Sequence, residues 1–192
     1  MHACTLALAA LFLALPLTGA AAQSEGRTVT AAIVGGPREG SKAPDFSLPW
    51  ANKETIGTPD ARYELWRDRG KTVVLAFYPS DFTKGCTAEM QTFADQYETL
   101  FGPDVVVLGV SADPLESHQR FAASLDLPFR LLSDPNQEVA RKYGSNGDGR
   151  PKRTVFVIGP DGRVKYRNLK FNALDPKDYT ALGSAVQAAR GG

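Results

Sequence analysis

Cys86 is the side chain in this sequence best suited to covalent chemistry. It directly follows the turn-forming residues 79–85. The stretch before the turn, 72–78, is apolar and β-branched, which predicts a strand buried on both faces. Apolar residues at helical spacing come after the cysteine, so Cys86 falls in the first turn of a predicted helix. Because a helix N-terminus favours an anion and the thiolate is the reactive form of cysteine, this placement predicts a nucleophilic thiol.

Thr83 lies three residues before Cys86, at the position that the first cysteine takes in a C-x-x-C pair. A hydroxyl cannot form a disulfide, so exchange between two neighbouring thiols is excluded here. A thiolate with a hydroxyl close by instead suits binding and polarising a small oxygen species. A simpler interpretation is that Thr83 serves only as the N-cap of the helix.

Length and charge exclude several classes of function. The chain has 192 residues, with 22 Lys+Arg against 21 Asp+Glu and no block of like charges. The length predicts a single folded domain. The balanced, mixed charge predicts neither a nucleic-acid-binding face nor a surface for anionic lipid.

The N-terminal residues 1–22 predict a secretory signal peptide. They contain no Asp, Glu, Lys or Arg, and their apolar run ends in the small residues 19–22, with cleavage expected after Ala22. Cleavage would remove Cys4 and leave Cys86 as the one thiol of the mature protein. We therefore expect an exported protein of the bacterial periplasm, free of the membrane after cleavage, with a flexible arm at 23–40 and a folded domain at 41–192.

The remaining segments alternate between strand and helix patterns. A continuous helix is expected from Cys86 to about residue 102, and a further helix at 114–125. His118 falls on this second helix. It is expected at the surface or the edge of the core, since no carboxylate motif accompanies it. The other expected elements are a short extended piece at 41–48, a short helix at 60–69, strands 104–110 and 129–132, a helix at 136–143, a hairpin of 154–158 with 164–167, and a last helix at 175–190. This order predicts an α/β fold with a mixed central sheet between two helical layers.

Pro79-x-x-x-Thr83-x-x-Cys86 resembles the P-x-x-x-T-x-x-C signature of the peroxiredoxins. The fuller string 77–89 resembles the bacterioferritin-comigratory, or peroxiredoxin Q, branch, and further likenesses at 43–46, 132–144 and 153–162 extend the match over about residues 41–190. The resemblance implies a thioredoxin-like three-layer α/β/α fold. It also implies a thiol-dependent peroxidase with no metal and no other cofactor.

The same resemblance implies a role for four residues. Cys86 would attack the peroxide O–O bond and become a sulfenic acid, and Thr83 would hydrogen-bond the thiolate and the peroxide. Pro79 would wall the pocket against water, and Arg153 would keep the thiolate ionised and stabilise the departing oxygen. Pro79 as a simple turn-former and Arg153 as a surface residue on an edge strand are the alternatives. Glu89 also matches the branch, but the helix dipole alone explains an acid at this position, so Glu89 is not predicted to be a site residue.

One position departs from the family pattern. Many members of the branch carry a resolving cysteine five residues after the first, where this chain has Gln91. We therefore expect a one-cysteine cycle in which an external thiol, a small molecule or a thioredoxin-like protein, reduces the sulfenic acid. The substrates would be hydrogen peroxide and small organic hydroperoxides, and the protein a monomer or a homodimer. A periplasmic single-thiol thiol–disulfide oxidoreductase and a peroxide-sensing module are alternatives.

Overall fold

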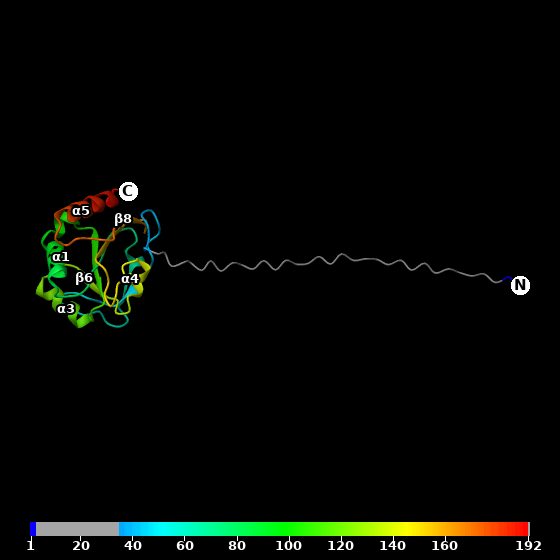
Figure 1. Ribbon diagram of the computed structural model, residues 1–192, viewed down its shortest axis with the longest axis horizontal. Coiled ribbons are helices and arrows are strands. Elements are labelled where there is room, and N and C mark those ends of the chain that lie inside the picture. The colour runs from blue at the N-terminus through cyan, green and yellow to red at the C-terminus, as the bar shows by residue number, and fades with distance from the viewer. Residues whose placement is uncertain (3–34, 192) are drawn as a thin grey trace. The chain divides into compact units, whose positions relative to one another are not determined.

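The computed structural model describes residues 1–2 and 35–191 (Figure 1). Nearly all of the predicted signal peptide and the arm up to residue 34 lie outside these residues. The last part of the arm packs on the domain: Gly36 and Pro37 are buried. Arg167 donates hydrogen bonds of 3.2 Å to the carbonyls of Gly35 and Pro37. Packing on the domain therefore starts before residue 41.

A six-stranded mixed sheet forms the centre of the domain. Its strands, in spatial order, are β2 (Trp50–Ala51), β6 (Arg130–Ser133), β5 (Val105–Ser111), β4 (Thr72–Phe77), β7 (Thr154–Ile158) and β8 (Val164–Asn168). The pairs β4–β5 and β5–β6 are parallel, whereas β2, β7 and β8 join antiparallel. The predicted mixed sheet is confirmed.

Helices cover both faces of this sheet. One apolar cluster packs α1 (Lys84–Asp95), α2 (Tyr97–Leu100), α3 (Leu115–Ser124) and α5 (Pro176–Arg190) on one face. A second cluster packs α4 (Glu138–Lys142) and the N-terminal segments on the other. Figure 1 shows α1 and α3 on the opposite side of β6 from α4. The predicted three-layer α/β/α arrangement is confirmed.

Strand β4 is buried along its whole length, which explains its continuous apolar sequence. Val74 and Ala76 belong to the cluster under α1 and α5, and Val73 and Leu75 to the cluster on the other face. None of these four side chains is more than 2% exposed. A strand between two helical layers has no polar face, so alternation is lost. Because β4 is fixed on both sides, it is a rigid base for the loop that follows it.

Several short elements differ from the prediction. The continuous helix expected from Cys86 is two helices, because Gln96 leaves helical geometry at φ −109° and ψ 19° between α1 and α2. The small sheet of β1 (Ser47–Leu48) and β3 (Tyr63–Glu64) was not predicted. The 3₁₀ helix η1 (Leu65–Asp68) lies within residues 60–69, where the sequence predicts a short helix. Among the helices of the described part of the chain, none has both the length and the apolarity to cross a bilayer.

Candidate active site

Cys86 occupies the third position of α1, at the end of the loop that follows β4. Thr83 is the N-cap of this helix, with extended backbone angles of φ −80° and ψ 146°. The Cys86 side chain is fully buried, and it is the one cysteine among the described residues. The cysteine therefore lies in the first turn of the helix, as predicted, close to the helix end whose free N–H groups favour an anion.

Arg153 reaches Cys86 from the neighbouring strand. It lies directly before β7, whose Thr154 pairs with Phe77 at the end of β4. Its Nη2 atom donates to Cys86 Sγ at 3.2 Å. A Cβ on Gly85 would lie 3.2 Å from the same Nη2, so the absence of a side chain there gives the guanidinium its room. Since β7 lies between β4 and β8, Arg153 does not precede an edge strand, and its side chain is only 17% exposed.

Thr83 and Pro79 lie in the loop itself. The Thr83 hydroxyl donates to the Ser80 carbonyl at 3.0 Å and makes no side-chain cap hydrogen bond to the helix. Its oxygen can therefore accept a hydrogen bond as it stands, but the hydroxyl must rotate to donate to a peroxide or a thiolate. Pro79 is half-buried at the start of the loop. The four predicted residues thus lie on two adjacent segments, the β4–α1 loop with its helix and the start of β7.

Glu89 is a charged partner of this site that the sequence prediction left out. It is fully buried on α1, and its Oε2 accepts a hydrogen bond from Arg153 Nη1. Its other oxygen, Oε1, has no hydrogen-bond partner among the described residues. Arg153 therefore bridges Cys86 and Glu89. The i, i+3 spacing of Cys86 and Glu89 was the available signal, because it places both on one helix face.

The charges of the Glu89, Arg153 and Cys86 side chains depend on one another. Burial raises the pKa of Glu89 to about 7, although Arg153 acts in the opposite direction. Burial disfavours the cationic form of Arg153, but Glu89 and Cys86 outweigh this and raise its pKa. Arg153 is thus a permanent cation that a Glu89 carboxylate and a Cys86 thiolate share. A proton on Glu89 leaves the guanidinium free to support the thiolate.

This ionisation predicts how stability depends on pH. The pKa of Glu89 is 4.5 in an unfolded chain and about 7 in the fold. Between these values the folded protein keeps a proton that the unfolded chain has released, so the free energy of unfolding falls as pH rises. We expect Glu89→Gln to remove this fall, which is on the order of 3 kcal/mol by the standard conversion. Urea denaturation of both proteins from pH 4 to pH 8 measures it, and parallel profiles would contradict the assignment.

His118 differs from its predicted place at the surface or core edge. It is fully buried on α3, and its Nδ1 lies 3.0 Å from Asp81 Oδ2. The carboxylate partner that the sequence did not reveal comes from the β4–α1 loop, because the fold places α3 against that loop. Asp81 and His118 are therefore two further residues around the site that the sequence prediction missed.

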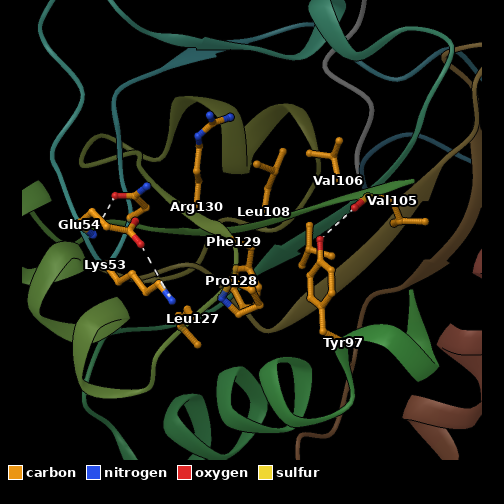
Figure 2. A pocket seen from close by; sticks show the side chains of 12 residues that line it. Lys53, Glu54, Tyr97, Val105, Val106, Leu108, Leu127, Pro128, Phe129 and Arg130 are labelled. Atoms are coloured by element: carbon orange, nitrogen blue, oxygen red, sulfur yellow. Dashed lines mark hydrogen bonds and ion pairs between the residues drawn. The ribbon is translucent and has the colours of Figure 1, made fainter. Parts of the chain in front are cut away.

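A cavity of about 420 Å³ lies elsewhere on the domain (Figure 2). Residues of β5 and of the segment before β6 line it, together with Lys53 and Tyr97. In it the Tyr97 hydroxyl donates to the Val105 carbonyl at 3.0 Å, as Figure 2 shows. None of Cys86, Thr83, Pro79 or Arg153 lines this cavity. It is therefore not the place where a peroxide would meet the thiol.

The AhpC/TSA family model matches residues 40–167. The chain belongs to the AhpC/TSA family of peroxiredoxins. It is 35% identical over 153 residues to peroxiredoxin Bcp of Bacillus subtilis (strain 168), covering 74% of this chain and 89% of that protein. It is 36% identical over 140 residues to the chloroplastic peroxiredoxin Q of Triticum aestivum, covering 71% of this chain and 61% of that longer protein. These relatives support the Bcp, or peroxiredoxin Q, branch.

A solved structure supports the same assignment. The crystal structure of peroxidoxin BcpB from Mycobacterium tuberculosis aligns with a TM-score of 0.67 and 28% identity, covering 80% of this peroxiredoxin and 99% of that chain. The thioredoxin-like fold is confirmed. Family membership makes this peroxiredoxin a thiol-dependent peroxidase, which is an oxidoreductase. The comparisons give no support to the alternative of a periplasmic thiol–disulfide exchange protein.

Proposed function

We propose that this peroxiredoxin reduces hydrogen peroxide and small organic hydroperoxides with Cys86 as its one catalytic thiol. The thiolate sulfur attacks one peroxide oxygen, forming an S–O bond as the O–O bond breaks. The second oxygen leaves with the bonding electrons and takes up a proton as water or an alcohol. Cys86 is left as a sulfenic acid. The observation that carries this proposal is the 3.2 Å contact between Arg153 Nη2 and Cys86 Sγ at the start of α1.

The other site residues would act on the same step. Arg153 opposes the thiolate and the charge that develops on the departing oxygen, a role that a fixed cation in a partly buried site performs well. Thr83 would hydrogen-bond the peroxide from the loop, and Pro79 would keep water from the sulfur. Because the Cys86 side chain is fully buried, a small peroxide can reach the sulfur with less rearrangement of the site than a protein thiol or disulfide needs.

An external thiol would close the cycle. The sulfenic acid condenses with one thiol to give a mixed disulfide and water, and a second thiol then releases Cys86 and a disulfide product. Each peroxide therefore consumes two thiols. Gln91 at the position five residues after Cys86 supports this one-cysteine cycle. A monomer or a homodimer can carry it out, since Cys86, Thr83, Pro79 and Arg153 all come from one chain.

Steady-state turnover tests the proposed cycle. We expect the purified protein to consume hydrogen peroxide continuously with a small dithiol or a thioredoxin-like protein, at two thiol groups oxidised per peroxide. A single stoichiometric reaction without turnover by any thiol reductant would contradict the cycle and favour the peroxide-sensing alternative. A faster reaction with a disulfide substrate than with peroxide would favour thiol–disulfide exchange.

We also propose export to the bacterial periplasm. The uncharged, apolar residues 1–22 with their small-residue end support it. In an exporting host, intact-mass measurement should give a mature protein that begins at Gln23 in the periplasmic fraction. Full-length protein confined to the cytoplasmic fraction would contradict export.

A further inference from the structure

The loop that carries Thr83 is bonded to the end of β5. The Ser80 hydroxyl donates to Asp113 Oδ1 at 2.9 Å, and the backbone N–H of Asp81 donates to Asp113 Oδ2 at 3.0 Å. Ser111, the last residue of β5, donates to the same Asp113 Oδ2 at 2.6 Å. Asp113 therefore ties two successive loop residues to the rigid sheet.

A second set of bonds holds the loop from inside the protein. The Asp81 carboxylate is buried, and it accepts a 2.7 Å hydrogen bond from the Tyr78 hydroxyl. Nδ1 of the fully buried His118 lies 3.0 Å from Asp81 Oδ2, and Nε2 lies 3.2 Å from the Leu132 carbonyl. Since a carbonyl oxygen can only accept, Nε2 is the donor in the contact with Leu132. His118 thus connects the loop to β6.

These bonds surround a backbone position of unfavourable geometry. Phe82 has φ +57°, in the left-handed region that a bulky residue rarely adopts, and its side chain is largely exposed. Such a conformation persists only where the residues on both sides are fixed. Asp81 is fixed by the bonds described above. Thr83 is fixed by its hydroxyl bond to Ser80 and by its carbonyl, which accepts from the Thr87 N–H at 2.8 Å.

We propose that His118, acting through Asp81, is a positioning residue that sets the conformation of residues 80–83 and thereby the place of the Thr83 hydroxyl at the N-cap of the helix that carries Cys86. The inference rests on the proposed function, since it assigns His118 to the peroxide step. Arg153 approaches Cys86 from the segment before β7, and among the described residues its side chain donates to Cys86 and Glu89 rather than to this network. Loss of the His118–Asp81 contact should therefore slow the attack on peroxide while the thiolate remains.

Two substitutions separate the two contacts of His118. An Asn side chain can keep a donor near the place of Nδ1, facing Asp81, whereas a Gln side chain can keep one near the place of Nε2, facing the Leu132 carbonyl. We expect His118→Gln to lower the second-order rate with hydrogen peroxide by about tenfold or more, because small misplacements at a reacting centre are costly. His118→Asn should stay within a few-fold of wild type. The thiolate fraction at neutral pH should be unchanged in both.

Three measurements on the full-length protein test the proposal. Stopped-flow kinetics gives the rate with peroxide, thiolate absorbance gives the thiolate fraction, and circular dichroism shows whether each variant is folded. The role of Asp81 would be overturned if His118→Asn reacted with peroxide more slowly than His118→Gln. It would also be overturned if both variants reacted at the wild-type rate. Equal loss of rate and thiolate in the Gln variant would also overturn it, since that is the result of a general structural defect. If neither variant folds, Tyr78→Phe, which removes the other donor to Asp81, should slow the peroxide step alone, and a wild-type rate there overturns the proposal. An inactive wild type would instead contradict the proposed peroxidase function.

Discussion

Cys86→Ser should reduce peroxide turnover to the uncatalysed background. A serine hydroxyl stays protonated near neutral pH and cannot form the sulfenic acid, so neither the attack on the O–O bond nor the thiol-dependent return step is possible. The two side chains are similar in size, so the buried position beside Arg153 should still be filled. Peroxide consumption in the presence of a thiol reductant measures the effect.

Gln91→Ala is the matched control on the same helix. The Gln91 amide donates to Asp95 at 2.7 Å on the helix surface, and among the described residues it makes no hydrogen bond to Cys86 or Arg153. We expect its turnover to equal that of the wild type. Substantial peroxidase activity in Cys86→Ser beside a normal Gln91→Ala would show that another group reacts with the peroxide.

Arg153→Met should have the second-largest effect, on activity and stability together. It removes the cation from Cys86, so the thiolate fraction at neutral pH should fall and the rate with peroxide should drop by about 10²-fold or more. It also leaves Glu89 buried without its partner, which costs roughly 3–5 kcal/mol when the carboxylate is ionised. The activity and stability of Arg153→Lys should lie between those of the wild type and Arg153→Met, because one ammonium cannot contact Cys86 and Glu89 with two separate nitrogens.

A double variant separates the two effects of Arg153. Adding Glu89→Gln to Arg153→Met removes the unpaired carboxylate, so the free energy of unfolding above pH 7 should recover while the peroxide rate stays low. Thiolate absorbance measures the thiolate fraction, stopped-flow kinetics the rate with peroxide, and urea denaturation the free energy of unfolding. A wild-type peroxide rate in Arg153→Met would refute the role of the guanidinium, and a recovered rate in the double variant would assign the loss to folding instead.

The position of Cys86 could be predicted because its signals are local. The apolar run of β4, the turn residues and the helical spacing after them lie within about two dozen consecutive residues, so no knowledge of tertiary contacts is needed. The layer order followed in the same way from the alternation of strand and helix patterns. The two-residue strands β1 and β3 had no comparable signal, since two residues are too few to show a period.

The contacts that shape the site are not local, and this is why most of them could not be derived. Arg153 lies 67 positions from Cys86 and reaches it through the pairing of β4 with β7. The motif resemblance pointed to Arg153, but no pattern pointed to His118, which lies 37 positions from Asp81. Glu89 was visible at i, i+3, yet an acid in the first turns of a helix has an ordinary explanation. Its complete burial, which gives it a role beside Arg153, appears only once the layers are packed.

The central claim is that Cys86 becomes a sulfenic acid on meeting a peroxide. Mass spectrometry of the protein after brief exposure to one equivalent of hydrogen peroxide, with a sulfenic-acid trap present, tests it most directly. We expect rapid, near-stoichiometric trapping at Cys86 and none in a sample first blocked with a thiol-alkylating reagent. A Cys86 that stays unmodified while the protein consumes peroxide, or that reacts no faster than a free small thiol, would contradict the account.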